Sequence, residues 1–141
     1  MKRIHTLGLL FTAFAVACTS VQEQVEETTI APPDPHSFSR PDITAVSHLD
    51  LNLNVDFNGQ QLSGTATWTL APEHGDELIL DTYELLLEHV QVDGQDVAYT
   101  LGEKDAILGE ALIIPLQKDS KQVSIAYKTT PGARALQWLE P

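Results

Sequence analysis

Alternating apolar and polar residues dominate the chain from residue 45 onward, and this pattern predicts a series of β-strands. In the first segment, residues 45–57, every second position is apolar: Leu49, Leu51, Leu53, Val55 and Phe57. The positions between them are polar: His48, Asp50, Asn52, Asn54 and Asp56. Because successive side chains of a strand point to opposite faces, the pattern predicts a long strand that is buried on one face.

A returning strand follows the turn signal Asn58-Gly59, so the sequence predicts a β-hairpin. A four-residue loop over residues 58–61 would place Leu51 opposite Trp68. A two-residue turn would keep the same faces but would set Gln60 opposite Phe57 on the apolar side. We therefore favour the longer loop.

Asp93-Gly94 is a second strong turn signal, and it predicts another hairpin. The strand before it, residues 85–92, begins with three leucines and is apolar on both faces, which is typical of a strand covered on both sides. A two-residue turn would pair Val90 with Val97, Glu88 with Tyr99, and Leu86 with Leu101. These pairs agree on one buried face.

A third hairpin is predicted over residues 112–127, where two alternating segments flank the polar loop 117–120. Its faces match if Leu116 lies opposite Val123. Pro115 has no amide to donate, so its strand should lie at a sheet edge or should turn that position to solvent. No segment after residue 20 shows a helical period, and residues 83–87 could form one helical turn at most. The sequence therefore predicts an all-β fold of hairpins, in a mostly antiparallel sheet or sandwich.

The first residues have the layout of an export signal, with the basic Lys2 and Arg3 followed by an apolar stretch from Leu7 to Ala17. That stretch is too short to cross a bilayer, which needs about 20 helical residues. Cleavage could follow an ordinary small-residue pattern, or the segment 15–18 could be a bacterial lipoprotein box. The second is favoured, because Cys18 is the only cysteine and an unmodified thiol is a liability in an oxidising compartment.

Three regions follow from these features: a signal peptide (1–17), an acylated flexible tether (18–41) and a β domain (42–141). The tether is rich in Glu, Gln and Thr and then in Pro, with too few apolar residues to offset the entropy of ordering. Removal of Lys2 and Arg3 with the signal changes the net charge from −12 to −14. A nucleic-acid partner is not expected, because phosphate binding relies on clustered Lys and Arg.

No catalytic motif is present in the sequence. A zinc hydrolase would use closely spaced ligands, most simply His-Glu-x-x-His, and the chain lacks it. His48 and Asp50 share a strand face, but they are only two ligands. Residues 73–77 contain three carboxylates and one histidine, and an ordinary charged turn explains them better than a calcium loop. His89 is expected to be a sheet residue, and a Gly-x-Ser-x-Gly nucleophile motif is also missing. We therefore expect this chain to bind no cofactor.

A set of short motifs, in order along about 105 residues, resembles the start of M1-family zinc aminopeptidases, in the branch of leukotriene A4 hydrolase and aminopeptidase B. The motifs are Asp34-Pro-His-Ser-Phe-Ser39 with Pro41, His48-Leu-Asp-Leu51, Leu62-Ser-Gly-Thr-Ala-Thr67, Glu77-Leu-Ile-Leu-Asp-Thr82, Val92-Asp-Gly94, Ile107-Leu-Gly109 and Thr130-Pro-Gly-Ala-Arg-Ala-Leu-Gln-Trp-Leu139. No single motif is decisive, but the ordered set is specific.

The resemblance implies a twisted, saddle-like amino-terminal β domain that is incomplete at its carboxyl end. In that family the zinc ligands, the catalytic base and the loop that binds the substrate amine lie in the next domain, so none of these roles transfers to a residue here. The implied partners are a downstream catalytic domain of the same polypeptide, peptide substrates of the whole enzyme, and a membrane through the lipid on Cys18. The implied location is the periplasmic face or the outer membrane, with a soluble periplasmic protein as the alternative.

Leu136, Trp138 and Leu139 are the candidate domain-docking residues, because large apolar side chains are unfavourable in water. If a partner domain normally covers them, Leu136 and Trp138 should be exposed in this chain and the last strand should be frayed. A self-standing surface lipoprotein with a ligand-binding or protein-binding β domain is the alternative. It should hold Trp138 buried or in a defined contact. A small independent hydrolase is disfavoured by the absent ligands.

Overall fold

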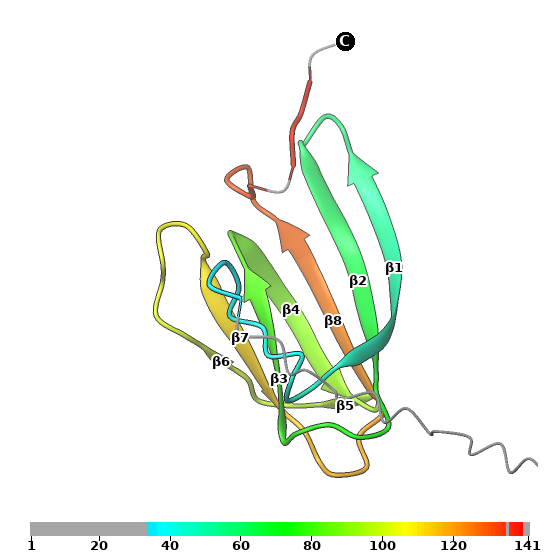
Figure 1. Ribbon diagram of the computed structural model, residues 1–141. Coiled ribbons are helices and arrows are strands. Elements are labelled where there is room, and N and C mark those ends of the chain that lie inside the picture. The colour runs from blue at the N-terminus through cyan, green and yellow to red at the C-terminus, as the bar shows by residue number, and fades with distance from the viewer. Residues whose placement is uncertain (1–33, 135, 140–141) are drawn as a thin grey trace, which may run out of the picture.

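Two antiparallel β-sheets make up the part of the chain that the computed structural model describes, residues 34–134 and 136–139. The larger sheet has the order β1-β2-β8-β4-β5, and the smaller sheet has the order β3-β7-β6 (Figure 1). The strands are β1 (Val46–Asp56), β2 (Gln61–Leu70), β3 (Glu77–Thr82), β4 (Leu85–Val92), β5 (Gln95–Asp96), β6 (Thr100–Leu101), β7 (Glu110–Pro115) and β8 (Gln122–Thr129). The predicted all-β, antiparallel fold is confirmed.

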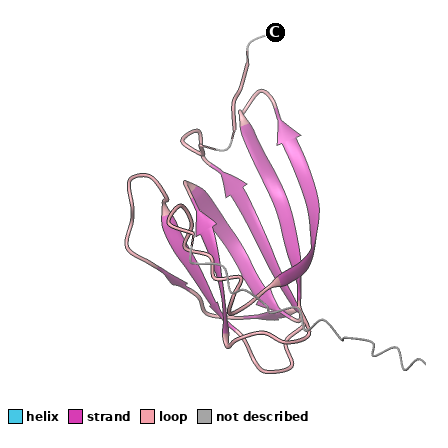
Figure 2. Cartoon of the chain, viewed as in Figure 1, coloured by secondary structure: helices cyan, strands magenta, loops and turns pink. Residues whose placement is uncertain are grey.

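Strands are the only regular elements in the described residues, which Figure 2 shows as magenta arrows joined by loops. Accordingly, these residues contain no helix of the length and apolarity that crossing a membrane would require.

The hydrophobic core lies between the two sheets and takes side chains from both. Its buried members are Leu70, Leu78, Val90, Val92, Leu112, Ile114, Leu116, Val123 and Ile125. Strand β1 contributes none of them, because the smaller sheet covers the larger one only in part (Figure 1). The prediction that the first strand buries one face is therefore wrong for the described residues. The alternation is present, but every residue of β1 is exposed.

The β1–β2 hairpin forms as predicted, but its register differs from the favoured one. Leu51 lies opposite Ala66, and Leu49 lies opposite Trp68. This register is the one expected for the tighter Asn58-Gly59 turn. The ladder ends at Asp56 and Gln61, so Phe57 and Gln60 belong to a four-residue loop and are not a strand pair. The Asp56 carboxylate accepts the Asn58 and Gly59 amides at 3.0 and 2.9 Å, which stabilises the loop.

The second predicted hairpin is correct only near its turn. Asp93 and Gly94 both have positive φ, and Val97 donates its amide to the Val90 carbonyl at 3.0 Å. The chain then leaves the larger sheet, and Thr100–Leu101 pair with β7 in the smaller one. The predicted pairs of Glu88 with Tyr99 and of Leu86 with Leu101 are therefore wrong.

Strand β4 is covered on one face only, which corrects the prediction of cover on both. It pairs with β8, with a register shift between Leu87 and His89, and it buries Val90 and Val92. Leu86 stays exposed on the opposite face. His89 is likewise exposed, beside Glu88, whose carboxylate pairs with Lys128.

The third predicted hairpin does not form, because β7 and β8 belong to different sheets. Strand β7 pairs with β3 and β6, whereas β8 lies between β2 and β4. The apolar alternation was nevertheless informative, since Leu112, Ile114, Leu116, Val123 and Ile125 are all buried. Strand β7 is central and not an edge strand. It tolerates Pro115 because this residue ends the strand, beyond the two residues of β6.

The two connections that join the sheets lie together at one end. The ring of His74, in the β2–β3 connection, contacts the Gly75 carbonyl through Nδ1 at 2.7 Å and the Ser120 carbonyl through Nε2 at 2.8 Å. Ser120 lies in the β7–β8 connection and is buried. His74 therefore ties the two crossovers to each other, which explains the histidine of segment 73–77 as a structural residue.

Candidate docking surface

The three predicted docking residues follow β8 and have different environments. Leu136 is half-buried and lines a groove between the sheets. Trp138 is half-buried, and its ring meets the ring of Phe57 edge to face, with 6.0 Å between the centroids. Leu139 is 82% exposed. The expectation that Leu136 and Trp138 would both be exposed is therefore not met.

The reason is that the turn after β8 holds this segment against the domain. The Thr130 amide donates to the Glu84 carbonyl at 3.1 Å, and Ala133 is buried. The Arg134 guanidinium lies over the Tyr83 ring, 4.4 Å from its centroid, a favourable cation–π geometry. The path of the chain is thus fixed up to Arg134, just before the docking residues.

The groove has a volume of about 580 Å³ and is mainly apolar. Its walls come from the inner faces of both sheets, with Leu51, Trp68 and Tyr127 from the larger sheet and Leu80 and Leu112 from the smaller one. Ser39, Asp81, Thr82 and Thr129 add the few polar groups. A groove of this composition is suited to apolar side chains and offers little for binding a charged substrate.

The inner face of β1 continues this groove as an uncovered apolar surface, which we call the β1 stripe: Leu49, Leu51, Leu53, Val55 and Phe57. These side chains are between 38% and 78% exposed. Their partners on β2 include Trp68, Ala66 and Leu62, which line the groove, so the stripe faces the same side. Strand β1 is also the edge of its sheet. Contiguous exposed apolar surface of this kind is typical of an interaction site.

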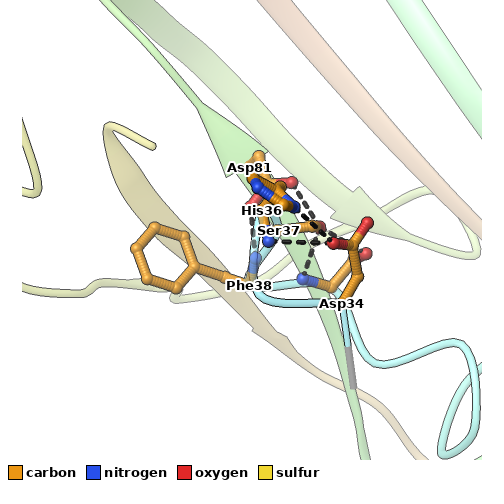
Figure 3. Close-up of polar contacts among 6 residues, drawn as sticks. Asp34, His36, Ser37, Phe38 and Asp81 are labelled. Carbon is orange, nitrogen blue, oxygen red and sulfur yellow. Dashed lines mark hydrogen bonds and ion pairs between the residues drawn. The ribbon is translucent and has the colours of Figure 1, made fainter. Parts of the chain in front are cut away.

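Asp81 of β3 binds the segment that precedes β1, as Figure 3 shows. Its carboxylate accepts the Ser37 hydroxyl at 2.6 Å and the Phe38 amide at 2.7 Å. The Asp34 carboxylate accepts the His36 amide at 2.9 Å, and this hydrogen bond is the main reason that the pKa of Asp34 is lowered. Residues in the predicted tether thus contact the domain before residue 42. Sequence reasoning missed Asp81, because an Asp at an exposed strand position has no distinctive spacing.

Replacing Asp81 should release segment 37–39 from β3. Asp81→Ala removes both acceptors, at a cost of about 1 kcal/mol for each surface hydrogen bond. Asp81→Asn keeps one oxygen and should lie between the variant and the parent protein. Amide hydrogen exchange at Phe38 measures the effect, and Asp96→Ala is the control, since Asp96 contacts Gln91 at 3.0 Å on the other sheet. Unchanged exchange at Phe38 in Asp81→Ala would contradict this account.

The candidate metal ligands do not assemble into a site. His48 Nε2 lies 3.4 Å from Asp50 Oδ1 on the exposed face of β1, without a third ligand beside them. Over residues 34–134 and 136–139, no three His, Cys, Asp or Glu side chains are grouped so that they could hold a metal ion. Cys18, the predicted lipidation site, lies outside the described residues. The described part of the chain thus has no arrangement that fits a catalytic zinc.

The remaining shifted charges stabilise local structure on the surface. Hydrogen bonding to Arg40 lowers the pKa of Asp42, and hydrogen bonding to Glu84 raises the pKa of Lys104. The amides of Leu108 and Ile107 donate to Asp105 and lower its pKa, which shapes the loop before β7. None of these three groups belongs to the groove lining.

Comparison with known proteins gives a consistent result. The chain is 38% identical to leucine aminopeptidase 2 of Yarrowia lipolytica over 112 residues, which cover 77% of this chain and 17% of that protein. It is 33% identical to leukotriene A4 hydrolase of Xenopus laevis, over 75% of this chain and 19% of that enzyme. No protein-family model matches the chain.

The solved structure of native leukotriene A4 hydrolase from Saccharomyces cerevisiae superposes on 76% of this chain with a TM-score of 0.68 and 33% identity. The match covers 18% of that enzyme, so the chain spans less than a fifth of the relatives it matches. Fold and sequence together define a β domain of the aminopeptidase class. The chain belongs to the M1 family of metallopeptidases, in the leukotriene A4 hydrolase group, and corresponds to its amino-terminal region.

Proposed function

We propose that this chain is the non-catalytic amino-terminal β domain of an exported zinc aminopeptidase, which removes amino-terminal residues from peptides. The domain supports the catalytic part of the enzyme and lines one side of its substrate cleft. The observation that carries the proposal is the superposition on yeast leukotriene A4 hydrolase, of which this chain matches 18%. The apolar groove and the β1 stripe support it, since they suit packing against further polypeptide better than catalysis.

Zinc would be held elsewhere in such an enzyme, because the described residues offer no ligand group for it. The metal would polarise the scissile carbonyl and activate a water molecule. The role of this chain would be structural, and its carboxylates and histidines take no part in the chemistry. Whether an epoxide hydrolase activity accompanies the peptidase is left open.

We expect the isolated chain to hydrolyse leucine p-nitroanilide no faster than buffer does. A chimera in which it replaces the matched segment of yeast leucine aminopeptidase 2, which is 36% identical, should recover chelator-sensitive activity. The yeast enzyme lacking that segment is the control and should be inactive. Chelator-sensitive hydrolysis by the isolated chain would refute the non-catalytic role, and an inactive chimera would refute the supporting one.

Export and anchoring are a separate part of the proposal, supported by the basic and apolar layout of residues 1–17 and by the single cysteine. Acylation of Cys18 would attach the domain to the periplasmic face of a membrane. In a bacterial host, labelled palmitate should enter the parent chain and should be absent from Cys18→Ser. Ser20→Ala, which keeps the cysteine, is the matched control. Equal labelling of Cys18→Ser and the parent would contradict lipidation.

A self-standing surface lipoprotein remains the second candidate. The contact of Trp138 with Phe57 favours it, since a defined contact of the tryptophan is what this candidate requires. Phe57 is itself 78% exposed, however, so the two rings form a pair on the surface and not part of the core. The chimera distinguishes the candidates, because a self-standing domain has no reason to restore a peptidase.

A further inference from the structure

The β1 stripe is a large apolar surface for which the described residues provide no cover. Leu49, Leu51, Leu53, Val55 and Phe57 lie in one row on an edge strand, and the groove between the sheets continues the row inward. We propose that an apolar segment of the enzyme's own following polypeptide packs on this stripe and fills the groove, as a second layer beside the smaller sheet. This inference rests on the proposed function and names the partner of that surface.

The path of the chain after β8 is the first argument for this occupant. Leu136 already lies in the groove, and the ring of Trp138 meets Phe57 at the end of the stripe. The segment therefore follows the open side of the larger sheet, toward the tip of the β1–β2 hairpin (Figure 1). Polypeptide that continues from here begins next to the stripe, so an intramolecular contact has a high effective concentration.

The size of the uncovered surface is the second argument. Five large side chains at 38% to 78% exposure, with a groove of about 580 Å³ beside them, need several apolar residues to cover them. The relatives extend far beyond the matched segment, which is only 17% of the Yarrowia lipolytica protein. A covering segment of that length is therefore available within one polypeptide of this family.

Charge argues against a second copy of the chain as the occupant. Each copy carries a net charge of −12, so two copies repel each other. Pairing of two β1 edges in antiparallel orientation would also bring Asp50 and Asp56 of both copies onto one sheet face. A covering segment within the same polypeptide has no such repulsion between copies to overcome.

The test compares two neighbouring positions on β1 in a Cys18→Ser background. Leu51→Cys places a thiol on the stripe, and Asn52→Cys places one on the opposite face of the same strand. Both positions are exposed in this chain, so both thiols should react with a maleimide at similar rates. In the chimera with yeast leucine aminopeptidase 2, the Leu51→Cys thiol should react at least about tenfold more slowly, and the Asn52→Cys thiol should keep its rate.

The outcomes separate this inference from the proposed function. Equal rates in an active chimera would overturn the inference and leave the proposed function intact. Protection at Leu51→Cys in an inactive chimera would support the inference and count against the proposed function. Protection in the isolated chain that increases with its concentration would identify a second copy and overturn the inference. A second chimera, built on the Yarrowia lipolytica relative, repeats the comparison if the first does not fold.

Discussion

Leu78→Ala should lower the free energy of unfolding by about 2–5 kcal/mol, the usual range for truncating a buried leucine. Leu78 is 2% exposed on β3, lies opposite Ile114 of β7, and belongs to the core between the sheets. Its removal leaves a cavity at the contact that holds the smaller sheet on the larger one. Because a domain of this size has a stability of only about 5–15 kcal/mol, the loss should be obvious in urea unfolding.

Leu86→Ala is the matched control, since it makes the same change at a side chain that is 54% exposed. It should cost less than about 1 kcal/mol, because little apolar surface returns to water. If the two variants unfold at the same urea concentration, the position of the core between β3 and β7 is wrong. Leu78→Val provides a smaller step if the alanine variant is already unfolded in buffer.

The sequence was sufficient to predict the strands but not the sheets. Alternation reports which side chains share a face, and Leu112, Ile114, Val123 and Ile125 are buried accordingly. It does not report which strand lies beside which. The apolar positions of stretches 112–116 and 123–127 match those of a hairpin equally well, yet β7 and β8 lie in different sheets. Pairing across 50 or more residues, as between Trp68 and Val123, leaves no local signal.

Burial was overpredicted for the same reason. The pattern of β1 specifies an apolar face, but whether that face is covered depends on polypeptide that the pattern does not describe. The three leucines at the start of β4 likewise indicated cover on both faces, and Leu86 proved to be exposed. Apolar residues that remain exposed are informative in this domain, because they define the docking surface more completely than Leu136, Trp138 and Leu139 alone.

Several motifs that carry the family resemblance prove to be contacts between distant segments. Asp81, in one motif, holds Ser37 and Phe38 of another. The β4–β5 turn provides a second example, because the Asp93 carboxylate accepts the amides of Lys121 and Gln122 at 3.1 and 3.0 Å. These residues fix the positions of loops, which hydrophobic periodicity cannot specify. The motifs therefore identified the family where the alternation pattern alone could give only the fold class.

Gly109→Ala should be the most damaging of the small substitutions in loops. Gly109 has a φ of +83°, in the left-handed region, and an added Cβ would lie 2.0 Å from the Thr82 carbonyl oxygen. Its backbone also pairs with Asp105, whose amide donates to the Gly109 carbonyl at 2.7 Å. Neither neighbour can move easily, because Thr82 ends β3 and the Asp105 loop leads directly into β7.

Gly94→Ala separates the two costs, because Gly94 has a similar φ of +78° but no atom within 4 Å of the added Cβ. It should lose about 1–2 kcal/mol, the cost of a left-handed alanine. Gly109→Ala should lose about 1–3 kcal/mol more, the usual cost of forcing atoms into occupied space. Thermal unfolding of both variants measures the difference. Similar melting temperatures would show that the loop at residues 105–109 is not packed against the end of β3, and close packing would then not explain why a glycine occupies position 109.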